Sequence, residues 1–230
     1  QLWFCRDCPQ KTMIKIAYSA LIACLVLALT GCPNNVKPEE PTPVYKKPKI
    51  ALVLGGGGAR GFAHIGVIKV LEVNGIEPDM VLGTSAGSAA AALYAAGYSG
   101  FQLQEMADSL NQATVADWSF FGKGLIKGEA LQNFINSKVQ NKPIEQLRRR
   151  FACVATKFKS GQGVLFETGN TGKAVRASSS VPGIFEPVII NGEEYYDGGL
   201  VSPVPIRYAK QMGAEVIIAV DISTPPSGDA

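Results

Sequence analysis

The sequence predicts an α/β domain with a largely parallel central sheet and helices on both faces, and three observations carry this prediction. From Lys49 onward, short apolar runs of strand length alternate with longer segments of helical spacing. The runs are continuously apolar, as in strands that are buried on both faces. The 230 residues, 47% of them hydrophobic, suffice for one sizeable core. Strand–helix alternation of this kind is typical of parallel sheets.

The expected strands are short apolar runs bounded by turn residues. Ile50 to Leu54 is a continuous apolar run that ends in glycines. Asn191-Gly192 is a two-residue turn signal and predicts a hairpin between the two runs beside it. The complete set of expected strands is 50–54, 80–82, 151–156, 164–166, 188–190, 194–196 and 215–220.

The expected helices fall between these strands. Residues 61–74 have apolar side chains at helical spacing and close on Asn74-Gly75, while 88–96 is rich in alanine and ends at Gly97. Residues 101–139 are expected to be mostly helical with an interruption near 117–124, and 205–212 forms a last helix. Aromatic residues in that interruption either line an apolar pocket or pack together: Trp118, Phe120 and Phe121.

The first 31 residues predict a secretory signal. The chain starts at Gln1 rather than Met, so we expect residues 1–12 to be a non-native upstream extension and Met13 to be the start. A basic beginning at Lys15 precedes an uncharged run over 16–29, which fits a signal peptide over 13–31 and is short for a membrane span. A buried core helix over 14–29 is the alternative.

Leu29-Thr30-Gly31-Cys32 resembles a lipobox, the lipidation signal of bacterial lipoproteins. The resemblance implies that Cys32 becomes the lipidated first residue, carrying fatty acyl groups such as palmitate. It also implies a membrane lipoprotein that faces the periplasm. The absence of Asp after Cys32 favours the outer membrane. A second string of this kind ends at Cys24, but it leaves a much shorter apolar region.

The remaining chain divides into three expected parts. Residues 32–48 are rich in proline and predict an extended tether. Residues 49–222 form the globular domain, and residues 223–230 read as a loop-like end that is consistent with truncation. No internal repeat is evident.

Charge and cysteine content exclude two classes of function. Residues 1–31 hold three of the 22 basic residues and one of the 19 acidic residues, so the remainder is nearly neutral. A nearly neutral domain offers no electrostatic basis for binding nucleic acid. Beyond Cys32 only Cys153 remains, in an apolar run, which supports neither an internal disulfide nor a cysteine metal site. We expect Cys153 to be a buried small hydrophobe.

The strongest chemical signal is Gly83-Thr84-Ser85-Ala86-Gly87, which follows an expected strand and precedes an expected helix. A nucleophile elbow needs this context, because the serine must sit on a tight turn with its hydroxyl clear of the backbone. Gly83 and Gly87 remove side chains that would collide there. A chance glycine turn is the alternative interpretation.

A serine needs a base, and the usual base is histidine. The single histidine of the chain, His64, comes before Ser85, whereas the triad order of α/β-hydrolases requires one after it. Either the site is inactive or a carboxylate accepts the proton. Asp197, followed by Gly198 and Gly199 just after an expected strand, is the candidate, although Asp-Gly-Gly is also an ordinary turn.

The run Gly55 to Gly58, followed by Ala59-Arg60-Gly61, lies between an expected strand and helix. Successive glycine N–H groups there form an anion-binding nest. The anion is either a dinucleotide pyrophosphate or the oxyanion of acyl transfer. A dinucleotide site requires an acidic residue at the end of the second strand, whereas that strand runs into Ser85. Arg60 either adds positive charge to the nest or forms a surface ion pair.

Together these motifs resemble the patatin-like phospholipase family over about Ile50 to Val220. The resemblance rests on Gly56 to Gly61, the elbow, Asp197-Gly198-Gly199 and the stretch Ala177 to Phe185. It implies a three-layer sandwich, hydrolysis of acyl esters in membrane lipids, and a Ser-Asp dyad without histidine. Ser85 would be the nucleophile and Asp197 the base, with an oxyanion hole at Gly56, Gly57 and Gly58. No metal or organic cofactor is expected, and His64 is expected to be structural.

Two further functions remain as alternatives. The first is a catalytically silent lipid-binding lipoprotein that keeps the fold. The second is a nucleotide-binding protein that uses the glycine loop, which predicts stabilisation by dinucleotides.

Overall fold

The computed structural model describes residues 46–110 and 126–223. The predicted signal peptide, Cys32, most of the tether, the aromatic residues at 118–121 and the end after residue 223 lie outside the described residues. From Lys47 onward the described chain forms one compact unit.

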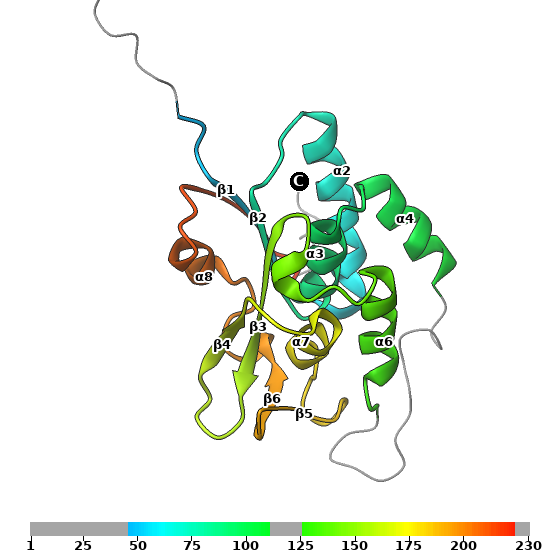
Figure 1. The fold of residues 1–230 in the computed structure, drawn as a ribbon, viewed down its shortest axis with the longest axis vertical. Coiled ribbons are helices and arrows are strands. Elements are labelled where there is room, and N and C mark those ends of the chain that lie inside the picture. Colours follow the sequence, from blue (N-terminus) through cyan, green and yellow to red (C-terminus); the bar gives the residue numbers. More distant parts are fainter. Residues whose placement is uncertain (1–45, 111–125, 224–230) are drawn as a thin grey trace, which may run out of the picture. The chain divides into compact units, whose positions relative to one another are not determined.

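A seven-stranded sheet runs through this unit in the order β5-β6-β3-β2-β1-β7, with β4 pairing to β3 outside that order (Figure 1). The four strands β3, β2, β1 and β7 are parallel, whereas β4, β5 and β6 pair antiparallel. The prediction of a parallel sheet therefore holds for its centre. The strands are β1 (Ile50–Leu54), β2 (Met80–Thr84), β3 (Arg150–Lys157), β4 (Gly163–Phe166), β5 (Val188–Ile190), β6 (Glu193–Asp197) and β7 (Val216–Val220).

Strand β3 is longer than its neighbours, and two of them pair along the same edge of it. β4 pairs with residues 153–156, β2 with residues 150–154 and β6 with residues 155–157. Each residue of a strand has only two edges, so the overlaps place β4 on one edge and both β2 and β6 on the other. Because β2 is parallel to β3 and β6 is antiparallel, the carboxyl ends of β2 and β6 meet head to head.

Helices cover both faces of the sheet, as predicted. They are α2 (Ala63–Val73), α3 (Ala86–Ala96), α4 (Gly100–Ser109), α6 (Glu129–Lys138), α7 (Thr171–Ser178) and α8 (Ile206–Gln211). Short 3₁₀ turns add η1 (Gly58–Phe62), η2 (Ile144–Gln146) and η3 (Gly198–Leu200). The sequence patterns did not predict α7.

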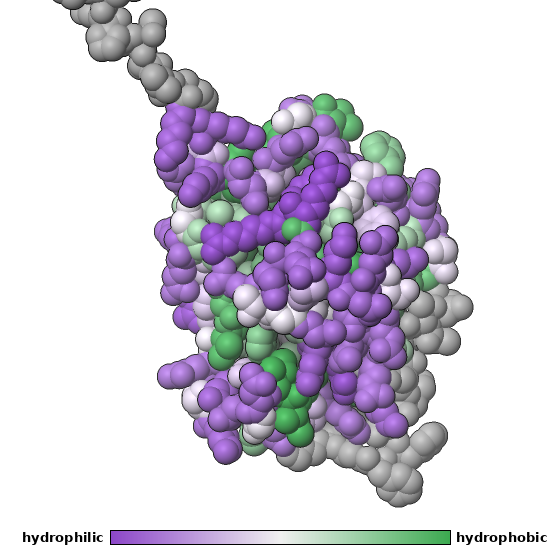
Figure 2. Space-filling model, in the orientation of Figure 1, coloured by the Kyte–Doolittle hydropathy of each residue, from purple (hydrophilic) through white to green (hydrophobic). Residues whose placement is uncertain are grey.

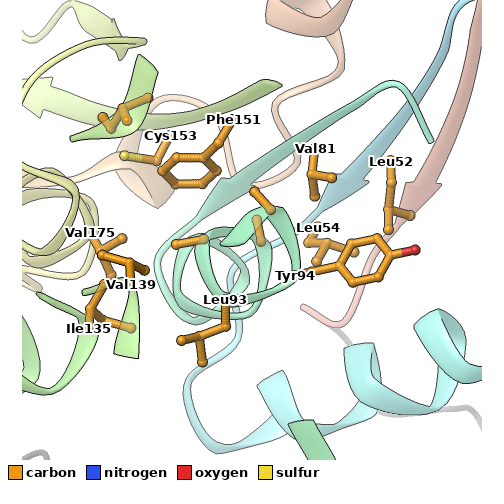
Figure 3. Packing of buried hydrophobic residues seen from close by; sticks show 14 of the residues in the cluster. Leu52, Leu54, Val81, Leu93, Tyr94, Ile135, Val139, Phe151, Cys153 and Val175 are labelled. Carbon is orange, nitrogen blue, oxygen red and sulfur yellow. The ribbon is translucent and has the colours of Figure 1, made fainter. Parts of the chain in front are cut away.

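Alternation along the buried strands divides the core between the two faces. Leu52, Leu54 and Phe151 point into the larger cluster, which packs against α3, α4, α6 and α7 (Figure 3). Ala51 and Val53 point to the other face, which α8 covers. Cys153 belongs to the larger cluster, and burial raises the pKa of its thiol. This confirms its expected place in the core.

Local sequence signals explain several element ends. Ser99 and Gln102 form a capping box that starts α4, and Gly97, with a φ of 111°, ends α3. The β5–β6 hairpin turns at Asn191 and Gly192, both with positive φ, as the two-residue turn signal predicts.

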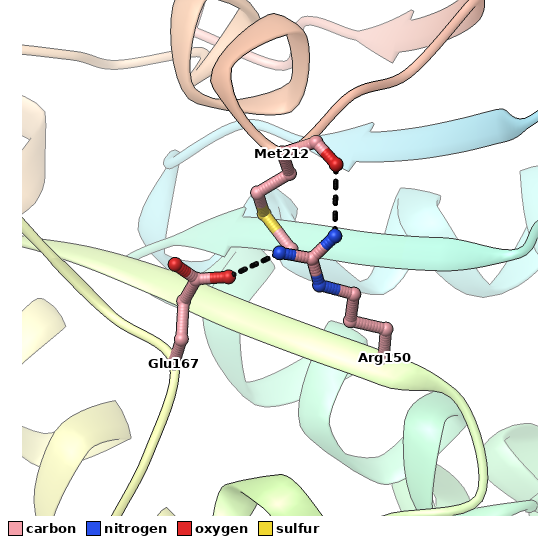
Figure 4. Close-up of polar contacts among 3 residues, drawn as sticks. All are labelled: Arg150, Glu167 and Met212. Atoms are coloured by element: carbon pink, nitrogen blue, oxygen red, sulfur yellow. Dashed lines mark hydrogen bonds and ion pairs between the residues drawn. The ribbon is translucent and has the colours of Figure 1, made fainter.

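Arg150 ties three elements together at the start of β3. It donates to the carbonyl of Met212 after α8 and to Glu167 after β4, each at 2.8 Å (Figure 4). Both charged side chains are about half exposed, so the ion pair adds about 1 kcal/mol at most.

The surface in the view of Figure 2 is mostly hydrophilic, with small apolar areas between charged side chains. Within the described ranges, no helix has the length and apolar character to cross a membrane.

Candidate active site

Ser85 occupies a strained turn between β2 and α3. Its φ of 54° and ψ of −128° lie in a region that a residue with a side chain adopts only when its surroundings enforce it. The two flanking glycines allow that turn. A Cβ on Gly83 would strike the carbonyl of Gly87, and a Cβ on Gly87 would strike the carbonyl of Leu54. The elbow predicted from sequence is thus present as a backbone conformation.

Hydrogen bonds hold the Ser85 backbone on both sides. Its carbonyl accepts from the N–H and the hydroxyl of Ser88, at 2.8 Å and 2.6 Å. Its N–H donates to Oγ of Ser178, at 3.0 Å. The first of these partners is local, whereas the second comes from α7.

Asp197 ends β6 and lies beside Ser85, because β2 and β6 meet on one edge of β3. Thr84 pairs with Val154, and Asp197 pairs with the next residue, Ala155. The approach requires Gly198, since a Cβ there would strike the carbonyl of Val154.

The Asp197 carboxyl is 5% exposed and asymmetrically hydrogen-bonded. Oδ1 accepts from the N–H of Gly199, at 2.6 Å. Oδ2 has no partner at full hydrogen-bond geometry among the described residues. Burial raises the pKa of this carboxyl, while hydrogen bonds from the Ser85 side chain and the Gly199 N–H lower it. The Ser85 hydroxyl is therefore near enough to lower the pKa of Asp197, but its contact with the carboxyl is looser than the bond from the Gly199 N–H. Loose contacts of this kind are common in unliganded sites.

One part of the predicted oxyanion hole in the glycine loop is wrong. The N–H of Gly56 already donates to the carbonyl of Pro203, at 3.0 Å, so it is not free to bind an anion. Gly56 instead permits close approach, since a Cβ there would lie 3.2 Å from Cβ of Ser85. The N–H groups of Gly57 and Gly58 have no acceptor in the described part of the chain. Gly58 has a φ of 57°, which turns the chain into η1.

The two remaining motif residues of the loop have different surroundings. Gly61 packs against α3, because a Cβ there would lie 2.8 Å from Cβ of Ala86. Arg60 is exposed. The pKa of Asp221 is lowered mainly by its hydrogen bonds with Ser223, and the charge of Arg60 contributes to that lowering. Arg60 therefore interacts with a surface carboxylate.

His64 is fully buried under the glycine loop. Its Nε2 lies 2.8 Å from the carbonyl of Gly55, and only a protonated Nε2 can donate to a carbonyl. Nδ1 has no partner among the described residues, and burial lowers the pKa of the ring. His64 is thus a neutral histidine that supports the loop, in agreement with its expected structural role.

An apolar cavity of about 390 Å³ opens beside Ser85. Its floor is α3, where Ala86, Ala89, Ala90 and Leu93 face it, and α2, α4 and α6 contribute side chains to its walls. The other apolar lining residues include Ile65, Leu103, Met106, Leu131, Phe134, Val181 and Phe185. Sequence patterns did not identify this cavity, since each residue appears in its own helix as ordinary core.

The described residues contain no group of three or more His, Cys, Asp or Glu side chains that could hold a metal ion. The arrangement at Ser85 is suited to nucleophilic chemistry. A strained serine at an apolar cavity lies beside a buried carboxylate, one oxygen of which has no partner among the described residues. The nearby N–H groups of Gly57 and Gly58 likewise have no acceptor in the described part of the chain.

Comparisons with known proteins agree with this arrangement. The model of the patatin-like phospholipase family matches residues 52–210. An uncharacterised NTE family protein of Mycobacterium tuberculosis is 35% identical over 189 residues, which are 80% of this chain and 51% of that protein. Human patatin-like phospholipase domain-containing protein 6 is 36% identical over 188 residues, which are 78% of this chain and 14% of that protein.

The crystal structure of VipD from Legionella pneumophila superposes with a TM-score of 0.58 at 15% identity. The match covers 67% of this chain and 46% of that chain, and it supports the three-layer fold. The present chain spans about half the length of the first curated relatives it matches.

Proposed function

The chain belongs to the patatin-like phospholipase family, and from this premise we propose that it is a serine hydrolase of carboxylic esters in lipids, of the phospholipase A or lysophospholipase type. One observation carries the proposal. Ser85 is held in a strained conformation next to a buried carboxylate, at the mouth of an apolar cavity. An ester with a long acyl chain fits such a site, because the chain can leave water while its carbonyl stays at Ser85.

In the first step Ser85 Oγ attacks the ester carbonyl carbon, and its proton passes to Asp197. Oδ2, which has no partner at full hydrogen-bond geometry among the described residues, is the oxygen that can accept this proton. The negative charge that develops on the carbonyl oxygen requires hydrogen-bond donors. The N–H groups of Gly57 and Gly58 are the donors we assign, and each such donor is typically worth about 100- to 1000-fold in rate.

In the second step the tetrahedral intermediate collapses, the leaving alcohol takes the proton from Asp197, and an acyl group remains on Ser85. A water molecule then gives its proton to Asp197 and attacks the acyl carbonyl. The fatty acid leaves, and Ser85 regains its proton. Each step uses side chains and N–H groups of the chain together with water.

The test compares Ser85→Ala and Asp197→Asn with the parent on a short-chain nitrophenyl ester. Both variants should lose on the order of 10⁶-fold in kcat, as removal of a nucleophile or its base does in other serine hydrolases. Undiminished turnover in either variant refutes the assignment of that residue.

A silent lipid-binding protein is the second candidate, because the same apolar cavity would hold an acyl chain without any chemistry. A fluorophosphonate probe separates the two, since it reacts only with an activated serine. Labelling of the parent that disappears in Ser85→Ala supports the hydrolase. Absence of labelling in a folded parent supports the binding protein.

The substrate within the class of lipid esters is open to one direct comparison. Purified membrane lipids are incubated with the parent or with Ser85→Ala, and the two lipid profiles are compared. A lysophospholipid, a diacyl phospholipid or a neutral glyceride that falls only with the parent identifies the substrate.

We also propose that Cys32 is lipidated and anchors the enzyme to a membrane, facing the periplasm and in the outer membrane. The lipobox-like string supports this proposal. More than one acyl chain would be needed for stable anchoring, because a single chain binds only marginally. Cys32→Ser should abolish incorporation of an alkynyl palmitate, and persistent incorporation excludes this cysteine as the lipidated residue.

A further inference from the structure

Ser178, the last residue of α7, forms a hydrogen-bonded bridge between Ser85 and β3. Ser178 takes no part in the chemical steps proposed above. Its side chain is fully buried. Oγ accepts the N–H of Ser85, at 3.0 Å, and donates to the carbonyl of Val154 in β3, at 2.6 Å. A hydroxyl has one proton to donate and lone pairs to accept, so both contacts can be made at once.

The bridge lies where β2, which ends next to Ser85, meets β6, which ends at Asp197. Val154 is the partner of Thr84 at the end of the β2–β3 ladder, and the next residue of β3 pairs with Asp197. The same turn of chain also contacts Asp197, because the carbonyl of Ser180 accepts the N–H of Asp197, at 2.8 Å. The carboxyl end of α7 is therefore bonded to the backbones of both Ser85 and Asp197.

We propose that Ser178 is a positioning residue, whose hydroxyl holds the strained backbone of Ser85 so that the Ser85 side chain stays next to Asp197. The proposal rests on the proposed function, because it assigns Ser178 to the same reaction. A strained conformation persists only while its surroundings enforce it. The Ser88 contacts fix the Ser85 carbonyl, whereas the Ser178 bridge fixes the N–H on the other side.

Removal of the hydroxyl leaves the Ser85 N–H and the Val154 carbonyl without this partner. The peptide between Thr84 and Ser85 can then rotate toward an unstrained conformation, which moves Oγ of Ser85 away from Asp197. Misplacement of a reacting group by about 1 Å can cost about 100-fold in rate. Binding of the acyl chain should be unaffected, because Ser178 is not among the residues that line the cavity.

The experiment measures kcat and KM on a short-chain nitrophenyl ester for the full chain and its variants. Ser178→Ala should lower kcat by about 10- to 100-fold and leave KM within about twofold. Ser178→Cys keeps a weak donor and acceptor, so its kcat should lie between the two. If Ser178→Ala does not fold, the comparison of Ser178→Cys with the parent decides.

Thr171→Val is the matched control. Thr171 begins α7, is fully buried and donates its hydroxyl to the carbonyl of Lys142, at 2.7 Å, far along the helix from Ser85. The Thr171→Val variant loses one buried hydrogen bond away from the site. Its thermal stability should therefore fall while its kcat stays near that of the parent. An equal loss of kcat in Thr171→Val would show a general effect of helix destabilisation and overturn the proposal.

A measurement independent of activity separates this proposal from the proposed function. The amide hydrogen of Ser85 should exchange slowly with solvent in the parent and in Thr171→Val, and quickly in Ser178→Ala. An inactive parent with this exchange pattern would refute the hydrolase, while the hold of Ser178 on the Ser85 backbone would stand. A folded Ser178→Ala with parental kcat, or with unchanged exchange at Ser85, refutes the positioning role alone.

Discussion

The cavity beside Ser85 predicts how activity depends on acyl-chain length. It measures about 390 Å³. A water molecule occupies about 30 Å³ in the liquid and a methylene group a similar volume, so the cavity holds a single chain of about a dozen carbons. Burial of one methylene is worth about 0.8 kcal/mol, or about fourfold in an equilibrium constant. We expect kcat/KM to rise by about fourfold per methylene until the cavity is full.

Ala90 allows this reasoning to be tested, because it faces the cavity from α3. Ala90→Leu adds three carbon atoms to the floor. The preferred chain should shorten by about three carbons, and kcat/KM for the longest esters should fall by about 60-fold, which is three steps of about fourfold. Activity on butyrate should stay near that of the parent, since a short chain does not reach a full cavity.

The assay is a series of nitrophenyl esters from butyrate to myristate, each below the concentration at which it aggregates. Ala96→Leu serves as the control, because Ala96 lies at the other end of α3 and lines a different, polar pocket. An unchanged profile in a folded Ala90→Leu refutes the assignment of the cavity to the acyl chain. An equal shortening of the preferred chain in Ala96→Leu would also refute this assignment.

Further predictions concern the pKa values of Asp197 and His64 and the packing of Gly87. Burial raises the pKa of Asp197 above 3.8, so kcat/KM should fall on acidification at a pH higher than that. Folding disfavours the charged form, so stability is lost as pH rises through the folded pKa; Asp197→Asn should therefore unfold at higher urea than the parent at neutral pH but not near pH 3. Gly87→Ala should lose at least about 1–3 kcal/mol in urea unfolding, because the new Cβ strikes the Leu54 carbonyl. Gly66→Ala, with open space around its Cβ, should instead gain about 0.4–1 kcal/mol, and an equal loss in both would contradict the packing argument. Burial lowers the pKa of His64 below 6.5, so stability should decrease as pH falls from 6.5 toward the folded pKa; that decrease should be smaller in His64→Gln, and equal curves would exclude this histidine as its source.

The sequence predicted those features that depend on neighbouring residues. The apolar runs of β1 and β7, the Asn191-Gly192 hairpin and the turn at Ser85 are written in stretches of a few residues, and the structure has each of them. Asp197 could be placed at the end of a strand for the same reason. Because no histidine follows Ser85 in the sequence, a carboxylate is the candidate base, and Asp197 is that carboxylate.

Features that depend on distant contacts could not be predicted in this way. The Gly56 N–H was assigned to an oxyanion, because nothing near Gly56 in the sequence indicates that Pro203 would take it. Helix α7 has only eight residues, which is shorter than the window over which helical periodicity can be recognised. Its link to Ser85 and the cavity on α3 both arise only when separate helices pack on the sheet.

The shared edge of β3 and the hydrogen bonds of the glycine loop affect when the site is assembled during synthesis and folding. The nucleophile is made early, but its base comes 112 positions later, and the loop N–H groups of Gly55 and Gly56 are held by the still later Val220 and Pro203. Contacts of such long sequence separation are slow to form, because they require closure of a long loop. A nascent chain therefore carries Ser85 without its proposed base until Asp197 has been synthesised and β6 has paired with β3. We expect the proposed activity toward lipids to begin only when β7 has paired with β1 and Asp197 lies beside Ser85.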